Sequence, residues 1–164
     1  MCVFLSISIS AQGQDKSIHT ISEVLEDNDG DGTIDLLNQE VRVTGRASVD
    51  NWTFNNELLS VYIQDTKAGV QLFSGSLKTD IKAGDSLFAR GKLQLYYDKA
   101  EIVADSIEVI PDDGKVPAPV SLDRVIADPE KYIGMLAEGA AIVSQKSVSS
   151  GYRGVTVSVN DSTN

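Results

Sequence analysis

With 164 residues, 41% of them apolar, the chain has enough material for a packed core, in one large domain or in one and a half small ones. Its net charge of −10 argues against a nucleic-acid partner, because phosphate binding depends on Lys and Arg. The acidity is uneven, since residues 15–40 hold eight acids against one base and residues 41–110 hold nine acids against eight bases. The charge therefore argues against phosphate binding mainly for the first of these segments.

The N-terminus predicts export. Residues 1–9 are apolar, and the triplet at residues 11–13 has the small-x-small form that precedes signal-peptidase cleavage. We therefore expect residues 1–13 to be a signal-peptide remnant and the protein to be periplasmic, on the cell surface or extracellular. The alternative is a frayed N-terminal strand. The stretch is shorter than the about 20 apolar residues that span a bilayer, so no membrane-spanning segment is expected. Cys2 is the only cysteine, so the mature chain would contain no disulfide.

An acidic loop at residues 27–35 matches the first nine positions of a calcium-binding loop, with Gly32 at the sharp turn. The expected calcium ligands are the carboxylates of Asp27, Asp29, Asp31 and Asp35 and the carbonyl of Thr33. The match fails at position 12, where Asn38 replaces the bidentate Glu, and no second helix is predicted. The alternative interpretation is a solvated acidic turn.

Alternation of apolar and polar residues with period two predicts five strands, at residues 41–49, 59–64, 70–73, 87–95 and 100–110. Broken alternation in the fifth predicts a β-bulge. Inward positions are expected at Leu59, Val61 and Ile63 of the second strand and at Leu87, Ala89, Gly91, Leu93 and Leu95 of the fourth.

The connections between the strands carry turn signals. Residues 65–69 predict a hairpin turn in which Asp65 bonds its own backbone, and residues 74–84 predict an irregular connection. The proline-rich residues 111–119 predict an extended linker, and residues 121–127 a short helix capped by Ser121.

Part of the sequence recurs. Residues 157–164 echo residues 61–68, and upstream of both lie a short I/L-x-x-V motif and then a glycine, at 21–24 and 45 and again at 122–125 and 139. A period near 95 residues fits one small all-β unit. We therefore expect a complete unit at residues 18–110 and a truncated second unit at residues 120–164.

Five strands, with glycines in the first and fourth where a barrel must bend, predict a small closed Greek-key barrel. V-x-V-x-G at 41–45, Y-I-Q-D at 62–65, A-G-D at 83–85 and A-R-G at 89–91 make the sequence resemble the OB-fold modules of bacterial exported proteins. Such modules accompany secreted endonucleases and phosphoesterases, and they occur in the extracellular parts of sensor proteins. The resemblance implies an all-β, five-stranded OB-fold barrel followed by an incomplete OB-like repeat, with any catalytic activity in a separate downstream domain.

An OB barrel binds extended ligands across its outer face by aromatic stacking and basic side chains. The candidate ligand-binding residues are expected to point outward or to lie in the loop after the first strand, and they are Arg42, Arg46, Trp52, Phe54, Tyr62, Gln64, Phe73, Arg90, Lys92 and Tyr96. The alternative interpretation is that these residues have no ligand, because aromatic residues favour half-exposed strands by propensity alone.

Catalytic signals are weak. His19 is the only histidine, which leaves no Ser-His-Asp triad and no histidine-based metal site. We therefore expect an exported, non-catalytic OB-fold module of a larger extracellular protein, with single-stranded nucleic acid as the ligand class. The alternative is an interaction or spacer module of a surface sensor or adhesive protein that binds no ligand beyond calcium.

Overall fold

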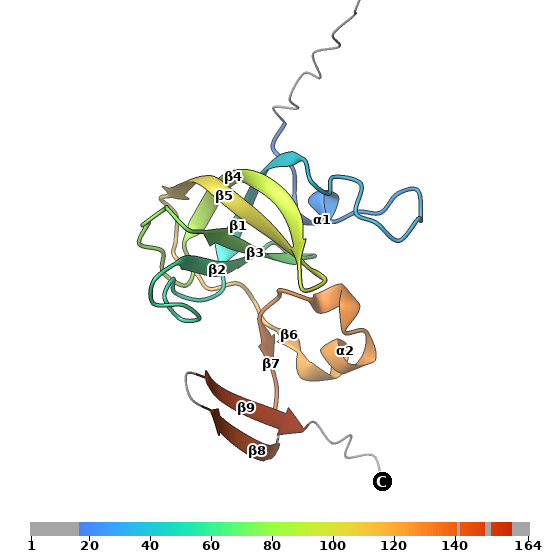
Figure 1. Cartoon of the computed structure of the whole chain (residues 1–164), viewed down its shortest axis with the longest axis vertical. Coiled ribbons are helices and arrows are strands. Elements are labelled where there is room, and N and C mark those ends of the chain that lie inside the picture. The colour runs from blue at the N-terminus through green and yellow to red at the C-terminus, as the bar shows by residue number, and fades with distance from the viewer. Residues whose placement is uncertain (1–16, 141, 150–151, 159–164) are drawn as a thin grey trace, which may run out of the picture.

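The structure is a computed structural model that describes residues 17–140, 142–149 and 152–158, with side chains up to residue 140. It consists of a β-barrel, a short helical segment and a two-stranded hairpin (Figure 1). The predicted signal-peptide remnant at residues 1–13 lies outside the described residues. Within the described part of the chain, no helix has the length and apolarity needed to cross a membrane.

Five strands close the barrel in the order β1-β2-β3-β5-β4. Their bounds are β1 Glu40–Ala47, β2 Leu59–Gln64, β3 Gly69–Ser74, β4 Ser86–Tyr96 and β5 Lys99–Ile110. The barrel closes where β1 pairs antiparallel with β4, and β3 and β5 pair in parallel. The prediction of a mainly β, five-stranded barrel is confirmed, and the order and Greek-key connection are those of an OB fold.

The predicted alternation places the barrel core correctly except at one end of β4. Leu59, Val61 and Ile63 of β2 are fully buried, as are Leu87 and Leu93 of β4 and their neighbours in the same apolar cluster. Leu95 was expected to point inward, but its side chain is 47% exposed. The reason is geometric, because β4 and β5 pair as far as Tyr96 and Lys99 and their hairpin extends beyond the barrel wall (Figure 1).

The bulge predicted in β5 is confirmed. Arg90 of β4 pairs with Ser106 and the next residue, Gly91, pairs with Ala104, so Asp105 is the extra residue on β5. Gly91 is required here, since a Cβ on it would lie 2.2 Å from the Val103 carbonyl oxygen. The bulge and the glycine together allow β5 to cross close over β4.

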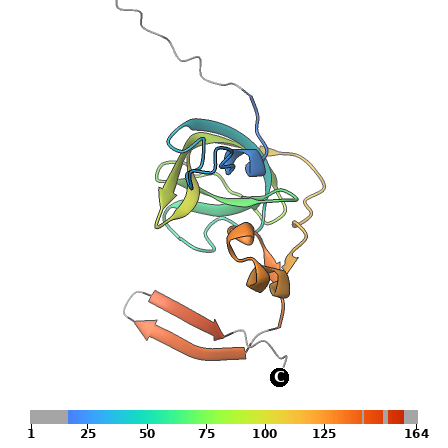
Figure 2. The same cartoon turned by 90° about the vertical axis from the view of Figure 1, so that its right-hand side faces the viewer.

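A short helix, α1 (Ile21–Val24), covers one end of the barrel (Figure 2). Ile21 and Val24 are fully buried in the barrel core, and a capping box between Thr20 and Glu23 begins the helix. Asp65 ties the helix to the β2–β3 turn, because one carboxylate oxygen accepts the Ile21 N–H at 3.0 Å while the other accepts two N–H groups of the turn. The predicted structural role of Asp65 is therefore confirmed.

Residues 120–158, named the second unit below, follow the linker at residues 111–119. The second unit contains β6 (Val120–Ser121), α2 (Leu122–Ala127), the 3₁₀ helix η1 (Glu130–Tyr132), β7 (Ala137–Glu138), β8 (Ile142–Ser149) and β9 (Tyr152–Ser158). The helix predicted at residues 121–127 is present, and Ser121 is its N-cap residue, although the Ser121 side chain makes no capping hydrogen bond.

The lead-in to the second unit is built like the lead-in to the first barrel. In the barrel, His19 forms a parallel bridge with Val43 of β1, and α1 begins two residues after His19. In the second unit, Val120 pairs in parallel with Ala137, and α2 begins two residues after Val120.

A glycine packs against the first residue of each helix. A Cβ on Gly45, two residues after Val43, would lie 2.8 Å from the Ile21 side chain. A Cβ on Gly139 would lie 2.4 Å from the Leu122 side chain. The sequence landmarks that recur therefore occupy equivalent places in the two lead-ins.

Strand register adds an independent correspondence. The first barrel pairs Arg46 with Gln64 in an antiparallel ladder, and the second unit pairs Ile142 with Ser158 in the same sense. In the sequence repeat, Gly45 of β1 corresponds to Gly139, which is 94 residues later. Residues 61–68, which include part of β2, correspond to residues 157–164, which are 96 residues later. The β1–β2 register, moved by these two shifts, holds at the pairs Ile142–Ser158 and Val143–Val157, and a bulge between Val143 and Gln145 displaces the rest of the β8–β9 ladder by one residue.

Candidate ligand-binding face

The loop between β1 and β2 is anchored at its base by Asn51. This side chain is 3% exposed, accepts the Ser60 N–H at 3.2 Å and donates to the Thr79 carbonyl at 3.3 Å. The next residue, Trp52, has φ of +72°, an uncommon conformation for a bulky residue. Its ring faces the Lys78 ammonium, which lies 5.8 Å from the ring centre. The loop therefore presents Trp52 from a fixed base.

An aromatic and polar row crosses the outer face of β2 and β3. The ring of Phe54, from the loop, meets the ring of Tyr62 edge to face at 5.6 Å. The Tyr62 hydroxyl donates to the Gln71 side-chain carbonyl at 3.2 Å, and the Gln71 amide donates to the Ser60 hydroxyl at 2.9 Å. Phe73 is the register partner of Ser60 and extends the row along β3. Four of the predicted residues, Trp52, Phe54, Tyr62 and Phe73, therefore lie on this face or on its adjoining loop.

The row continues onto β5 and β4. Glu101 stands beside Gln71 in the parallel β3–β5 ladder, is 4% exposed, and accepts the Gln94 side-chain amide at 2.7 Å. The outer side of these four strands thus carries aromatic rings and amides, together with the buried carboxylate of Glu101. Sequence alternation alone did not single out Gln71, Gln94 or Glu101, because the alternation marks them as outward without showing which outward residues meet.

Most of the predicted basic residues lie elsewhere. Arg42 is opposite Arg90 on the β1–β4 ladder, and Lys92 is opposite Glu40. Arg90 forms an ion pair with Asp105 at 2.8 Å, which raises the pKa of Arg90. Seven of the ten predicted residues are therefore divided between an aromatic face on β2–β3 and a basic face on β1–β4. Tyr96 belongs to neither, since it packs against Tyr97 at the tip of the β4–β5 hairpin with 4.6 Å between ring centres.

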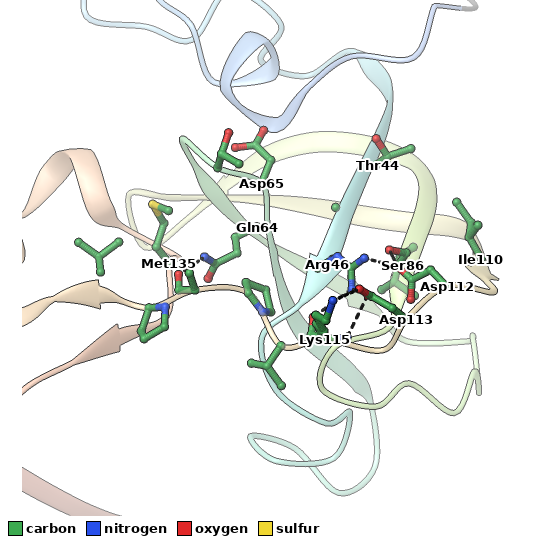
Figure 3. A pocket seen from close by; sticks show the side chains of 18 of the residues that line it. Thr44, Arg46, Gln64, Asp65, Ser86, Ile110, Asp112, Asp113, Lys115 and Met135 are labelled. Carbon is green, nitrogen blue, oxygen red and sulfur yellow. Dashed lines mark hydrogen bonds and ion pairs between the residues drawn. The ribbon is translucent and has the colours of Figure 1, made fainter.

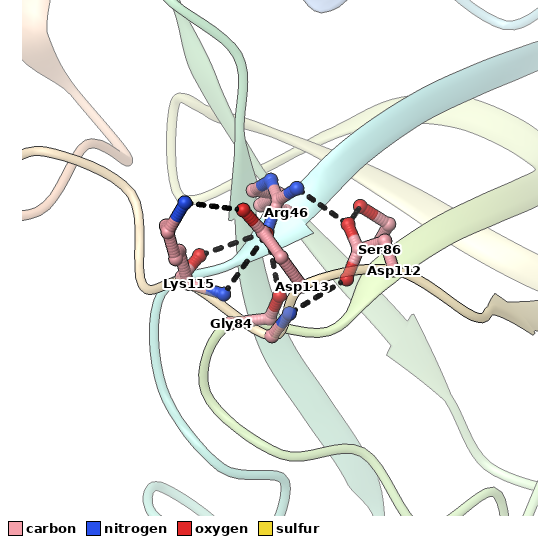
Figure 4. Close-up of polar contacts among 7 residues, drawn as sticks. Arg46, Gly84, Ser86, Asp112, Asp113 and Lys115 are labelled. Carbon is pink, nitrogen blue, oxygen red and sulfur yellow. Dashed lines mark hydrogen bonds and ion pairs between the residues drawn. The ribbon is translucent and has the colours of Figure 1, made fainter.

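Arg46 was expected to contact ligand but instead binds the linker (Figure 4). Its guanidinium forms ion pairs with Asp112 at 2.5 Å and with Asp113 at 2.9 Å. It also donates to the carbonyls of Gly84 at 3.2 Å and Lys115 at 3.0 Å. The charge of Arg46 is thus compensated by two carboxylates within the protein.

Gln64 was expected to be an outward residue that contacts ligand, but its side chain is only 3% exposed. The Gln64 carbonyl oxygen accepts the Leu136 N–H at 2.6 Å, and its amide donates to the Ala118 carbonyl at 3.4 Å. The position does lie on the outer side of β2, but the linker and the second unit cover it (Figure 3). Sequence alternation identifies the side of the strand on which a side chain lies. Whether that side chain is buried depends on which other segments of the chain pack over that side.

The linker and the barrel enclose a cleft of about 840 Å³, lined by the Arg46 cluster at one end and Met135 at the other (Figure 3). Acids at its edge are held ionised. A hydrogen bond from Lys115 and its nearby charge lower the pKa of Asp113 from 3.8 to about 2, and the Ser86 hydroxyl and Gly114 N–H lower the pKa of Asp112. The Asp112 shift thus reflects a contact between the linker and β4, whereas the main cause of the Asp113 shift lies within the linker itself.

The acidic loop folds around its own carboxylates. Asp27 accepts the N–H groups of Gly30, Asp31 and Gly32, and the first and last of these bonds are 2.8 Å long. The Gly32 N–H is the main cause of a lowered pKa for Asp27. Oxygens of Asp27, Asp29 and Asp35 lie within 4.8 Å of one another. Three of the predicted calcium ligands are therefore grouped, while Asp31 and Thr33 form part of the surrounding turn.

No protein-family model and no curated protein sequence matches the chain. Among solved structures, it is similar to asparaginyl-tRNA synthetase from Pyrococcus horikoshii, with a TM-score of 0.44 and 18% identity over 68% of this chain and 27% of that one. It is similar to a Leishmania major Friedlin protein described as an aspartyl-tRNA synthetase, with a TM-score of 0.44 and 11% identity over 77% of this chain and 29% of that one.

A third similar structure is the S. pombe Stn1-ten1 complex, with a TM-score of 0.35 and 12% identity over 44% of this chain and 59% of that one. The chain spans less than two thirds of the length of each of these three proteins. At these TM-scores and identities, no ligand or activity is transferred to this chain from them.

Proposed function

We propose that this chain is a non-catalytic binding module that holds single-stranded nucleic acid on the outer face of β2 and β3. The observation that carries the proposal is the row of Phe54, Tyr62 and Phe73, in which a loop aromatic packs edge to face on a strand aromatic, with Trp52 held on the same loop. Each nucleic-acid base has a face that can stack on such rings, and each stack contributes about 1 to 3 kcal/mol.

The electrostatics of the face favour stacking over phosphate contacts. Arg46 and Arg90 are already paired with carboxylates, so neither is available to replace counterions around a phosphate. The module would therefore bind with a shallow dependence on salt, because that dependence scales with the number of phosphates neutralised.

The proposal includes the setting of the module. We place it in an exported protein, on the basis of the sequence of residues 1–13, and we assign any catalysis to a domain other than this one. We also propose that the second unit begins another barrel of the same design. The equivalent parallel bridges, the glycines packed against the two helices and the common β1–β2 register support this assignment.

A titration of a labelled oligothymidylate with the full chain tests the function. We expect Tyr62→Ala and Phe54→Ala each to weaken binding by about 1 to 3 kcal/mol. Phe88→Ala is the matched control, since Phe88 lies on β4 opposite Thr44, away from the aromatic face. A flat titration of the unmodified chain at low salt would refute nucleic-acid binding.

The second candidate function is an interaction or spacer module that binds calcium. The grouping of Asp27, Asp29 and Asp35 supports it, because calcium prefers several carboxylate oxygens in one loop. Calorimetric titration with calcium should give a binding isotherm that Asp29→Asn weakens and Asp80→Asn leaves unchanged. Absence of heat at millimolar calcium would remove this candidate site.

A further inference from the structure

A pocket of about 340 Å³ opens where the barrel meets the second unit. Tyr62 and Gln71 of the aromatic face form part of its lining, and the β4–β5 hairpin contributes Leu95 and Lys99. Lys131 and Ile133, which belong to η1 and the turn after it, line the opposite side. The pocket is therefore built jointly by the first unit and by the second unit, which are far apart in sequence.

Backbone contacts hold the second-unit side of the pocket in place. Gly69 of β3 and Gly134 are so close that a Cβ on Gly69 would lie 2.2 Å from the Gly134 carbonyl oxygen. Gly134 has φ of +79°, which favours glycine at this turn. Two residues further on, the Leu136 N–H is bound by Gln64. The turn that carries Ile133 is thus fixed against the β2–β3 hairpin on both sides.

The lining of the pocket combines polar and apolar groups. Tyr62 and Gln71 bond each other, but the Tyr62 oxygen can still accept and the Gln71 amide can still donate a second bond. Leu95 and Ile133 are 47% and 48% exposed on facing segments of the lining. A nucleobase bound in the pocket would meet hydrogen-bonding groups together with apolar side chains.

The charged groups at the pocket are two lysines and two acids. Lys99 and Lys131 are exposed, and within the described residues neither forms an ion pair, in contrast to Arg46 and Arg90. The Lys131 ammonium lies 5.7 Å from the centre of the Tyr132 ring, a contact that leaves its charge without a carboxylate partner in the part of the chain that the structure describes. Asp98 and Glu130 also line the pocket, so the local charge is balanced. An ammonium group can contact a phosphate that flanks the bound base, while the carboxylates can accept hydrogen bonds from exocyclic amino groups.

We infer that this pocket is a nucleotide subsite of the binding face and that the second unit supplies part of it, with Lys131 contacting phosphate and Ile133 contacting the base. This inference rests on the proposed function. If the inference holds, the second unit contributes directly to the ligand site in addition to beginning the second barrel.

The test is the salt dependence of oligothymidylate binding, measured by fluorescence anisotropy with the full chain. Loss of one phosphate contact to a single strand reduces the slope of log affinity against log salt by about 0.7. We expect this reduction for Lys131→Ala and an unchanged slope for Lys82→Ala, since Lys82 is an exposed lysine that pairs with Asp80 and does not line the pocket.

A second variant tests the apolar contact through a different readout. Ile133→Ser should weaken binding several-fold without changing the salt slope, and near-ultraviolet circular dichroism of Trp52 reports whether the barrel remains folded. If the unmodified chain binds but Lys131→Ala and Ile133→Ser both bind like it, the composite subsite is wrong and the proposed function stands. If the unmodified chain does not bind, both proposals fail.

Discussion

Arg46 and Gln64 stand opposite each other in the β1–β2 ladder, and both side chains bind the chain segment that leaves the barrel. Arg46 holds the start of the linker through Asp112, Asp113 and the Lys115 carbonyl. Gln64 holds the end of the linker and Leu136, the residue just before β7. A single pair of facing residues in the β1–β2 ladder therefore fixes the course of the linker between the barrel and the second unit.

Gln64→Ala should loosen the second unit more than the barrel. The substitution removes the acceptor of the Leu136 N–H, and leaving such a group unsatisfied costs about 1 to 3 kcal/mol. Amide hydrogen exchange should show faster exchange at Leu136 with little change at buried Val61. Lys92→Ala is the control and should alter neither amide. Unchanged protection of Leu136 in the Gln64 variant would contradict this role.

The ion pair between Asp113 and Lys115, which both belong to the linker, should depend on pH in a defined window. Asp113 has a pKa lowered from 3.8 to about 2, first by its bond to Lys115, so it favours the folded state above pH 3.8. That contribution is lost as the pH falls from 3.8 through about 2. Nuclear magnetic resonance titration of the Asp113 carboxyl should give a midpoint near 2 in the native chain.

Lys115→Met should move the Asp113 midpoint upward, towards its ordinary value, because the main cause of the shift is removed. Lys92→Met should leave the midpoint in place, since Lys92 lies on the β1–β4 ladder. An Asp113 midpoint near 3.8 in the native chain would show that the contact with Lys115 does not form in solution.

Gly91→Ala should be among the most destabilising single changes in the barrel. The added Cβ would lie 2.2 Å from the Val103 carbonyl and 2.7 Å from the Ala104 Cα, so the backbone of β5 must move. We expect a loss of about 3 kcal/mol in the free energy of unfolding, measured by chemical denaturation. Gly75→Ala is the matched control, because its Cβ would meet nothing within 4 Å, and should change stability by no more than about 0.5 kcal/mol.

Asp65→Ala should act on stability. It removes the acceptor for the Ile21 N–H and for two N–H groups of the β2–β3 turn, so we expect a loss of about 2 kcal/mol in unfolding free energy. Thr66→Ala, in the same exposed turn, should change stability by no more than about 0.5 kcal/mol. Full stability of the Asp65 variant together with lost oligothymidylate binding would show a direct ligand role instead.

The sequence by itself determined the barrel. Alternation in β2 marks Leu59, Val61 and Ile63 as core, because a strand in a closed barrel has one buried face and its side chains alternate between faces. The bulge in β5 was equally visible, since an extra residue breaks that alternation. The turn role of Asp65 also follows from local chemistry, because the bonds that define it span two and three residues.

The tertiary structure alone decided how the outer face is used. Alternation places Arg46, Gln64 and Tyr62 on the same outward side, but their surroundings depend on segments that are distant in sequence. The side chains of Arg46 and Gln64 bind the linker, whereas the side chain of Tyr62 lines the pocket that η1 helps to form. Local patterns record which way a side chain points from its own strand. Contacts such as Gln64 with Leu136, 72 residues apart, arise only when the folded chain brings those segments together.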